Sequence, residues 1–106
     1  MRFLVVTKSR EGAPPEMAVG MMQMMQGWLA EHRASGKLEQ TWSFAGVQGG
    51  GGILDVDSLE ELDSIMAGFP FGQISTVEVY PLADLDAALT DQIAKVQAVL
   101  EAMGGG

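Results

Sequence analysis

The sequence predicts an α+β domain in which strands and helices follow one another along the chain. Four short segments are rich in β-branched, aromatic or alternating apolar residues, and three longer segments have apolar residues at helical spacing. The chain has 106 residues, of which 47 % are hydrophobic and 19 % are charged, which is typical of one globular domain. We therefore expect a single domain over residues 1–106.

The first half of the chain predicts a long helix between two strands. Residues 2–7 form a β-branched and aromatic run, which predicts a strand. Pro14 and Pro15 favour a helix start, and the helix is expected over residues 16–35. Residues 37–46 then alternate in polarity, which predicts a half-buried strand. One side of this strand is expected to carry Leu38, Gln40, Trp42 and Phe44.

A third strand and a second helix are expected next. The four glycines at residues 49–52 predict a mobile connection, and residues 53–56 predict the strand that follows it. This glycine run is not expected to bind phosphate, because no Lys-Ser or Lys-Thr follows it and a strand comes next. Ser58 and Glu61 have the spacing of a capping box, which predicts that the second helix begins directly after Ser58.

The last part of the chain predicts a fourth strand and a C-terminal helix. Residues 73–80 form the strand, which we expect Pro81 to end. A C-terminal helical extension is expected over residues 82–103, with apolar residues at helical spacing: Leu85, Leu89, Ile93, Val96, Leu100 and Met103. The order β-α-β-β-α-β is the ferredoxin-like pattern, in which two helices cover one face of an antiparallel four-stranded sheet. Because the other face is left open, we expect a second copy of the chain to cover it.

Composition and charge exclude several classes of partner and cofactor. Lys and Arg number 6 against 14 for Asp and Glu, so the net charge of −8 argues against nucleic acid and anionic membranes as partners. The absence of cysteine and the presence of one histidine exclude cysteine-based and all-histidine metal sites within one subunit. We expect neither a metal nor a cofactor. No apolar run reaches the roughly 20 residues of a membrane helix, and the start lacks a signal-peptide pattern, so we expect a cytoplasmic protein.

A pocket between the first helix and the sheet is the expected binding site. Methionine adapts to irregular shapes, and two tryptophans supply flat surfaces for a small ligand. The alternative is that the methionine-rich face simply fills the core. The residues expected to line the pocket are Met21, Met25, Trp28, Gln40, Trp42 and Ser75.

His32 is the candidate catalytic residue. It lies on the apolar face of the first helix, and histidine is the side chain that exchanges a proton most readily near neutral pH. The alternative is a partly buried histidine that only hydrogen-bonds the chain and turns its polar edge outward.

Several short motifs between residues 35 and 82 carry a resemblance to a known family. They are Ser35-Gly36-Lys37, Trp42, Gly46, Ile53-Leu54-Asp55-Val56, Ser58, Glu60-Glu61-Leu62, Phe69-Pro70-Phe71, Val77-Glu78-Val79 and Pro81-Leu82. In these motifs the chain resembles the muconolactone delta-isomerase family. The resemblance implies a dimeric α/β barrel, often assembled into rings, whose pocket isomerises a small butenolide acid by moving one proton.

The sequence departs from this family at two places. The family's first helix carries an acidic residue proposed to take part in proton transfer, whereas residues 21–26 read Met-Met-Gln-Met-Met-Gln here. His32 stands where the family tends to have an aliphatic residue, so we hypothesise that it replaces the acid. Gly72-Gln73 also replace a Phe-Pro of the family, and an extra helix follows, so pocket shape and assembly are expected to differ.

Three functions are compatible with the sequence. The leading hypothesis is a cofactor-free isomerase or cyclase of a small, largely apolar carbonyl or lactone compound, with His32 as acid and base. The second is a non-catalytic protein that binds a small ligand or serves in assembly on the same barrel. The third is a cofactor-free monooxygenase of aromatic polyketides. The fold alone does not choose among them.

Overall fold

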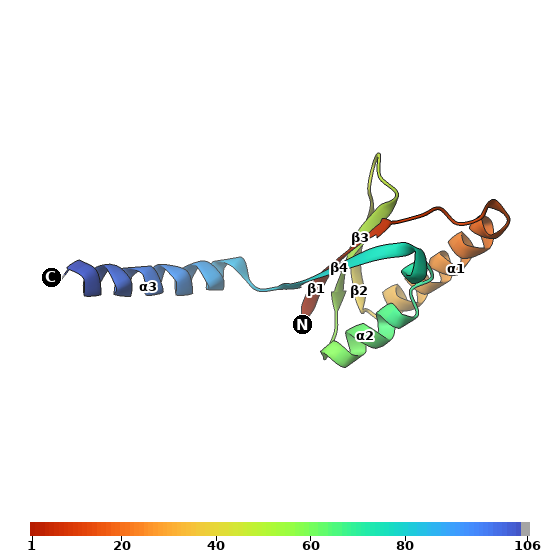
Figure 1. Ribbon diagram of the computed structural model, residues 1–106. Coiled ribbons are helices and arrows are strands. Elements are labelled where there is room, and N and C mark those ends of the chain that lie inside the picture. Colours follow the sequence, from red (N-terminus) through yellow and green to blue (C-terminus); the bar gives the residue numbers. More distant parts are fainter. Residues whose placement is uncertain (105–106) are drawn as a thin grey trace.

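The computed structural model describes residues 1–104 and confirms the expected order of elements (Figure 1). The strands are β1 (Arg2–Ser9), β2 (Leu38–Ser43), β3 (Gly49–Asp55) and β4 (Ser75–Leu82). The helices are α1 (Pro15–Ala34), α2 (Leu59–Ala67) and α3 (Leu85–Gly104), and a short 3-10 helix, η1 (Gly72–Ile74), precedes β4.

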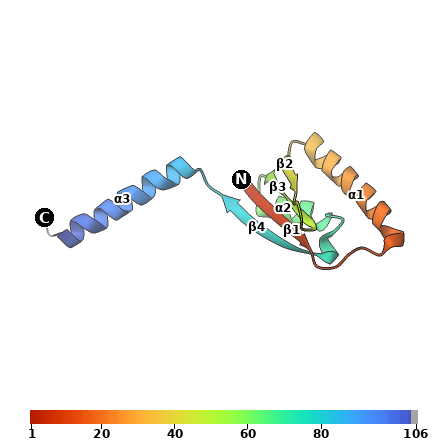
Figure 2. The same ribbon diagram turned by 90° about the horizontal axis from the view of Figure 1, so that it is seen from above.

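The four strands form one antiparallel sheet with the order β2-β3-β1-β4, which confirms the ferredoxin-like fold. Helices α1 and α2 lie on the same side of this sheet, whereas α3 points away from it (Figure 2). The extended α3 gives the molecule principal extents of 71 × 29 × 22 Å. Within residues 1–104, no helix is both long and apolar enough to cross a membrane.

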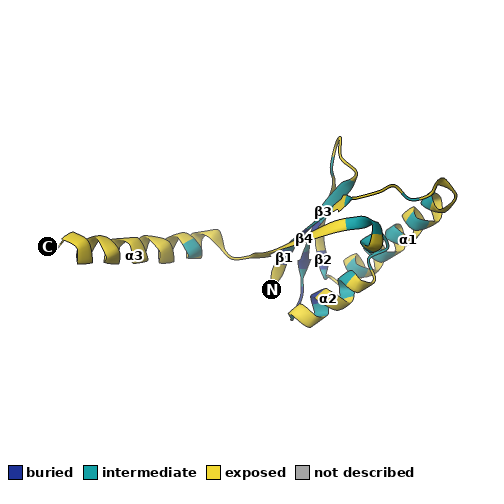
Figure 3. Cartoon of the chain, in the orientation of Figure 1, coloured by how far each residue is buried: buried dark blue, intermediate teal, exposed yellow. Residues whose placement is uncertain are grey.

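The buried core is small and lies between the centre of the sheet and α2 (Figure 3). Its six buried residues are Phe3, Val5, Leu38, Leu54, Val56 and Leu62. Partly buried side chains from α1 and α2 pack against them, namely Trp28, Leu29, Ile65 and Met66. No residue of α1 is fully buried, so this helix covers the sheet without closing tightly onto it.

The glycine run belongs to a strand, so the expectation of a mobile connection is wrong. Residues 49–52 form the first half of β3, and they pair with both β1 and β2. A Cβ on Gly49 would lie 2.2 Å from the Thr7 carbonyl oxygen, and a Cβ on Gly50 would lie 2.4 Å from the Trp42 carbonyl oxygen. The glycines are therefore required by the close approach of neighbouring backbones, and the strand is held by its hydrogen bonds rather than by side chains.

Pro81 does not end the fourth strand. It lies inside β4, opposite Phe3 of β1, and the strand continues to Leu82. Because β4 is at the edge of the sheet, the missing N–H of a proline can face away from the ladder at no cost in strand pairing. The strand also begins two residues later than expected, at Ser75, because η1 occupies the preceding residues.

A β-bulge in β2 separates residues that the sequence placed on one side. Leu38 pairs with Leu54, whereas Gln40 pairs with Ile53, so one extra residue is inserted in β2. Adjacent residues of β3 point to opposite faces, and Leu38 therefore faces the helices whereas Gln40 faces away from them. The expectation that Leu38 and Gln40 share a side is wrong, because the bulge shifts the alternation by one residue.

The face of the sheet opposite the helices is open and largely apolar. Cross-strand pairing places Leu4, Val6, Ile53, Tyr80 and Leu82 on this face. Tyr80 donates a hydrogen bond to Glu78 there, and this bond raises the pKa of the Tyr80 phenol. The cover by a second copy that the sequence suggested stays a prediction.

Ser58 caps α2, as expected. Its side-chain oxygen accepts a hydrogen bond from the Glu61 N–H at 3.1 Å. Glu61 also reaches back, since its carboxylate accepts a hydrogen bond from the Asp57 N–H at 3.2 Å. Both interactions satisfy backbone donors that the start of the helix leaves free.

Replacing Ser58 by alanine is expected to lower the free energy of unfolding by about 1 kcal/mol, because the N–H of Glu61 loses its acceptor. Urea denaturation followed by circular dichroism measures this change. Ser64→Ala is the matched control, since Ser64 is exposed on the same helix. Equal denaturation midpoints for the two variants would show that the cap contributes nothing to stability.

Candidate functional site

A cavity of about 750 Å³ lies between α1 and the sheet. Its floor is formed by β1, β2 and β3, including the four glycines at residues 49–52. Side chains of α1 form its roof, and residues between α2 and β4 close one side. The volume lies within the range of roughly 300–1,000 Å³ that is usual for small-molecule sites.

The wall of the cavity is apolar with a few uncharged polar groups. Among the described residues that line it, none is acidic, basic or a histidine. The polar side chains that it does present are those of Thr7, Ser9, Thr41, Ser43, Gln48 and Ser75. Two of these hydroxyls already donate to backbone oxygens, since Thr7 Oγ1 donates to the Gly50 carbonyl oxygen at 3.2 Å and Ser9 Oγ to the Glu11 carbonyl oxygen at 2.6 Å. This lining suits an uncharged ligand, since an ion would lose its hydration without gaining an opposite charge.

The structure distributes the expected pocket residues over three places. Four of them line the cavity, namely Met25, Trp28, Trp42 and Ser75. Met21 instead borders a neighbouring hollow of about 590 Å³ next to Pro70. Gln40 faces the open side of the sheet because of the bulge in β2. A binding role for any of these residues stays a prediction.

Trp42 borders the cavity, but its ring lies on the opposite face of the sheet. The ring lies near Gly51, where a Cβ would be 3.9 Å from the Trp42 Cε3 atom. Gly51 pairs with Val6, which places this ring on the open face. The flat surface that Trp42 was expected to offer to a ligand therefore faces away from α1.

Trp28 is the aromatic side chain that closes the cavity from the helix side. Its indole N–H donates to the Ile65 carbonyl oxygen of α2 at 3.3 Å. Its ring makes edge contacts with Phe69, at a centroid distance of 5.3 Å, and with His32, at 4.8 Å. These contacts place the indole against the cavity.

His32 lies next to the cavity rather than in its wall. The residues of α1 that line the cavity include Ala18, Met22, Met25 and Leu29, and His32 is the next position on the same helical stripe. His32 is not among the residues that line the cavity, but its half-buried imidazole contacts the ring of Trp28, which does line it. The catalytic role of His32 stays a prediction.

Arg33 is a residue near the site that the sequence did not single out. Its guanidinium donates to Thr41 Oγ1 at 2.8 Å, and Thr41 lines the cavity. The contact links the end of α1 to β2. It could not be found from the alternation of β2, because the bulge turns Thr41 toward the helices.

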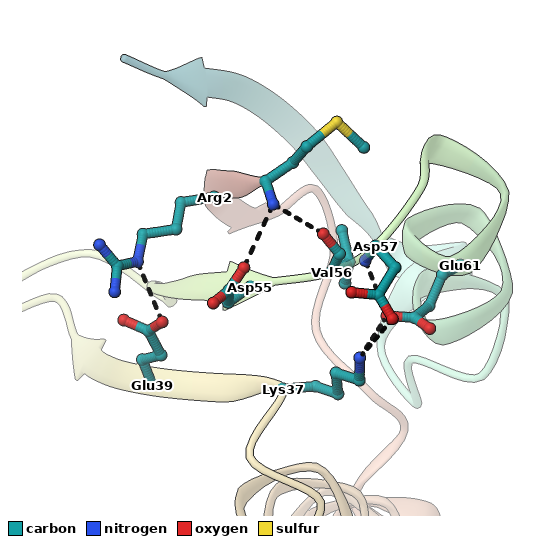
Figure 4. Close-up of polar contacts among 8 residues, drawn as sticks. Arg2, Lys37, Glu39, Asp55, Val56, Asp57 and Glu61 are labelled. Carbon is teal, nitrogen blue, oxygen red and sulfur yellow. Dashed lines mark hydrogen bonds and ion pairs between the residues drawn. The ribbon is translucent and has the colours of Figure 1, made fainter. Parts of the chain in front are cut away.

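The ion pairs of Arg2 and Lys37 involve no residue that lines the cavity. Figure 4 shows these two cations with their acidic partners. Lys37 Nζ lies 2.9 Å from Glu61 Oε1 and 3.4 Å from Asp57 Oδ2. Its hydrogen bond to Glu61 raises the pKa of Lys37, and burial opposes part of this effect. Arg2 pairs with Glu39 at 3.0 Å, and this hydrogen bond raises the pKa of Arg2. Neither cation is available to an anionic ligand in the cavity, and residues 1–104 contain no cluster of acidic or histidine side chains suited to a metal ion.

Fold and cavity together define a ferredoxin-like protein with a cavity between helix and sheet whose volume suits a small molecule. The chain belongs to the muconolactone delta-isomerase family, whose model matches residues 1–88. The match confirms the resemblance, extends it to β1 and α1, and leaves most of α3 outside the family's region.

Several solved structures share this fold, among them the following two. A crystal structure of muconolactone isomerase has a TM-score of 0.69 and 22 % sequence identity, over 79 % of this chain and 90 % of that one. A 5-chloro-2-hydroxyhydroquinone dehydrochlorinase from Burkholderia phenoliruptrix AC1100, in complex with 2,5-dihydroxybenzoquinone, has a TM-score of 0.67 and 18 % identity, over 82 % and 98 %. No curated protein is significantly similar in sequence. The family supports the conversion of a small molecule as the function of this fold.

Proposed function

We propose that the protein isomerises a small, uncharged carbonyl or lactone compound by proton transfer in the cavity beneath α1, without a cofactor. The observation that carries this proposal is the lining of the cavity, which combines apolar walls with hydroxyl groups and contains no charged side chain among the described residues. Membership of the muconolactone delta-isomerase family supports the reaction type. A second copy over the open sheet face belongs to the same proposal.

His32 is proposed as the group that removes and returns the proton. One base on one side of a substrate suffices for a 1,3-proton shift, because the same group can deliver the proton to its new carbon. The position of His32 on the cavity-lining stripe of α1 supports this role. In this proposal, movement of the Trp28 ring gives the imidazole access to the ligand, while hydroxyls such as those of Thr41 and Ser75 hold the carbonyl oxygen.

Proton NMR in deuterated water tests the proposed function directly. The full chain is incubated with muconolactone, with its methyl ester and with simple neutral butenolides. We expect isomerisation and deuterium entry into the ring above a protein-free control, and faster for the ester than for the acid, because the lining offers the carboxylate no cation. No exchange with any of these compounds would contradict the proposal.

The second candidate function is binding of a small ligand without chemistry. It is favoured by one observation, which is that no titratable side chain is among the described residues that line the cavity. The same NMR samples distinguish the two functions. Line broadening or chemical-shift changes of the butenolide without deuterium entry would support binding alone.

A further inference from the structure

Helix α3 is exposed along its whole described length. None of its residues is buried, and it extends away from the sheet in both views (Figures 1 and 2). Its large apolar side chains are between 45 % and 78 % exposed, from Leu89 to Met103. Most of the stability of a helix in a protein comes from packing its apolar face, so a helix of this length requires a partner surface.

The apolar residues of α3 have the spacing of a coiled-coil seam. We call this set the α3 seam; its members are Leu89, Ile93, Val96, Leu100 and Met103. The spacing between successive members alternates between four and three residues, as in a heptad repeat. Ile93 and Leu100 then occupy heptad position a, and position d is occupied by Leu89, Val96 and Met103. This 3.5-residue average is the repeat by which two helices pack side chains into one another.

From Leu89 onward, the charges of α3 are placed so that identical helices do not repel one another; Asp86, one heptad before Ile93, lies in the first turn before the seam begins. Positions that flank the seam are uncharged, namely Leu85, Thr90, Gln92, Gln97 and Val99. Asp91, Lys95 and Glu101 lie on the side of the helix that faces away from the seam. Asp91 and Lys95 form an ion pair within the helix, with 2.8 Å between Lys95 Nζ and Asp91 Oδ2. Like charges at the flanks would oppose pairing of two copies, and they are missing there. The pattern therefore favours a second copy of the same helix as partner.

The start of α3 opposes folding back onto the chain's own open sheet face. Only residues 83–84 join β4 to α3. Asp84 fixes the direction of the helix, because its carboxylate accepts from the Ala87 N–H at 2.9 Å and its carbonyl oxygen accepts from the Ala88 N–H at 3.0 Å. A helix of 20 residues is about 30 Å long, so from this start its seam lies beyond the body of its own subunit.

We propose that α3 pairs with α3 of a second copy of this chain, through the α3 seam, as a two-helix coiled coil. The pairing is independent of the proposed reaction, since the cavity and the seam share no residue. It joins subunits by a part of the chain that lies mostly beyond the matched family region.

Single-cysteine cross-linking of the full chain tests this pairing, because the chain itself contains no cysteine. Val96 is the middle residue of the seam, so in a parallel, in-register pair it lies directly opposite Val96 of the second copy. A disulfide forms only where the two Cα atoms come within roughly 4.4–6.8 Å. Under mild oxidation we expect Val96→Cys to give a covalent dimer and Ala98→Cys, on the opposite side of the helix, to give little. Equal yields from the two variants, or no covalent dimer from Val96→Cys together with equal association of the two charge variants below, would overturn the pairing.

A charge in the seam gives a second, independent readout. Ile93→Glu/Leu100→Glu is expected to weaken self-association of the full chain by about 100-fold, because carboxylates would be buried without partners. Ala94→Glu/Ala98→Glu adds the same charge on the outer side and is expected to leave association unchanged. Analytical ultracentrifugation over a concentration series measures both. Similar association constants for the two double variants would mean that α3 packs on something other than itself.

Discussion

Replacing His32 by glutamine is expected to lower the rate of deuterium entry into a neutral butenolide by about 10²- to 10⁴-fold, the usual contribution of a positioned general base. Glutamine keeps a polar side chain beside Trp28 but cannot take up a proton. The rate is measured by proton NMR in deuterated water under conditions where the unaltered chain turns over. Circular dichroism and the urea midpoint establish that the variant is folded.

The matched control for this variant is Glu31→Gln. Glu31 is the exposed neighbour of His32 on α1, and the substitution creates the same residue one position away. We expect it to retain the full rate, because Glu31 does not line the cavity. If His32→Gln exchanges deuterium as fast as the control, another group moves the proton and the assignment of His32 is wrong.

Replacing Gly50 by alanine is expected to lower the free energy of unfolding by about 1–3 kcal/mol, the range for forcing extra atoms into a packed region. The new Cβ would start 2.4 Å from the Trp42 carbonyl oxygen, so β2 and β3 have to separate. Since both strands floor the cavity, ligand affinity is expected to fall as well. Urea denaturation and titration of a butenolide by NMR measure the two effects.

Gly27→Ala is the opposite case and serves as the control. No described atom outside the helix's own backbone lies within 4 Å of a Cβ placed on Gly27. Alanine in a helix interior is favoured over glycine by about 1 kcal/mol, so this variant is expected to be more stable than the unaltered chain. A gain in stability for Gly50→Ala would show that the strands tolerate a side chain there, against the close approach described above.

The order of elements could be predicted from the sequence because each element carries a local signal. The prolines before α1, the capping serine of α2 and the helical spacing in α3 act over a few residues, and all three helices lie within two or three residues of their expected bounds. The role of the glycines could not be predicted in this way. Whether a glycine run forms a loop or a strand depends on how closely two other strands approach it, which is not a local property.

The candidate site was less predictable, for a related reason. Met25, Trp28 and Ser75 line the cavity, since a helical stripe and an alternating strand fix their faces locally. Gln40 does not, because a bulge depends on the pairing of two strands and leaves no clear mark in either sequence. The contact between Arg33 and Thr41 was missed for the same reason.

The bulge in β2 also has an evolutionary consequence. Leu38 and Gln40 already pair with the adjacent residues Leu54 and Ile53, so Glu39 is the extra residue of the bulge. Deletion of Glu39 would make the pairing of β2 regular while Thr41 keeps facing the cavity and Trp42 keeps facing the open side. A lineage carrying this fold can therefore lose or regain the bulge by a change of one codon without exchanging the residues that line the cavity for those on the open face.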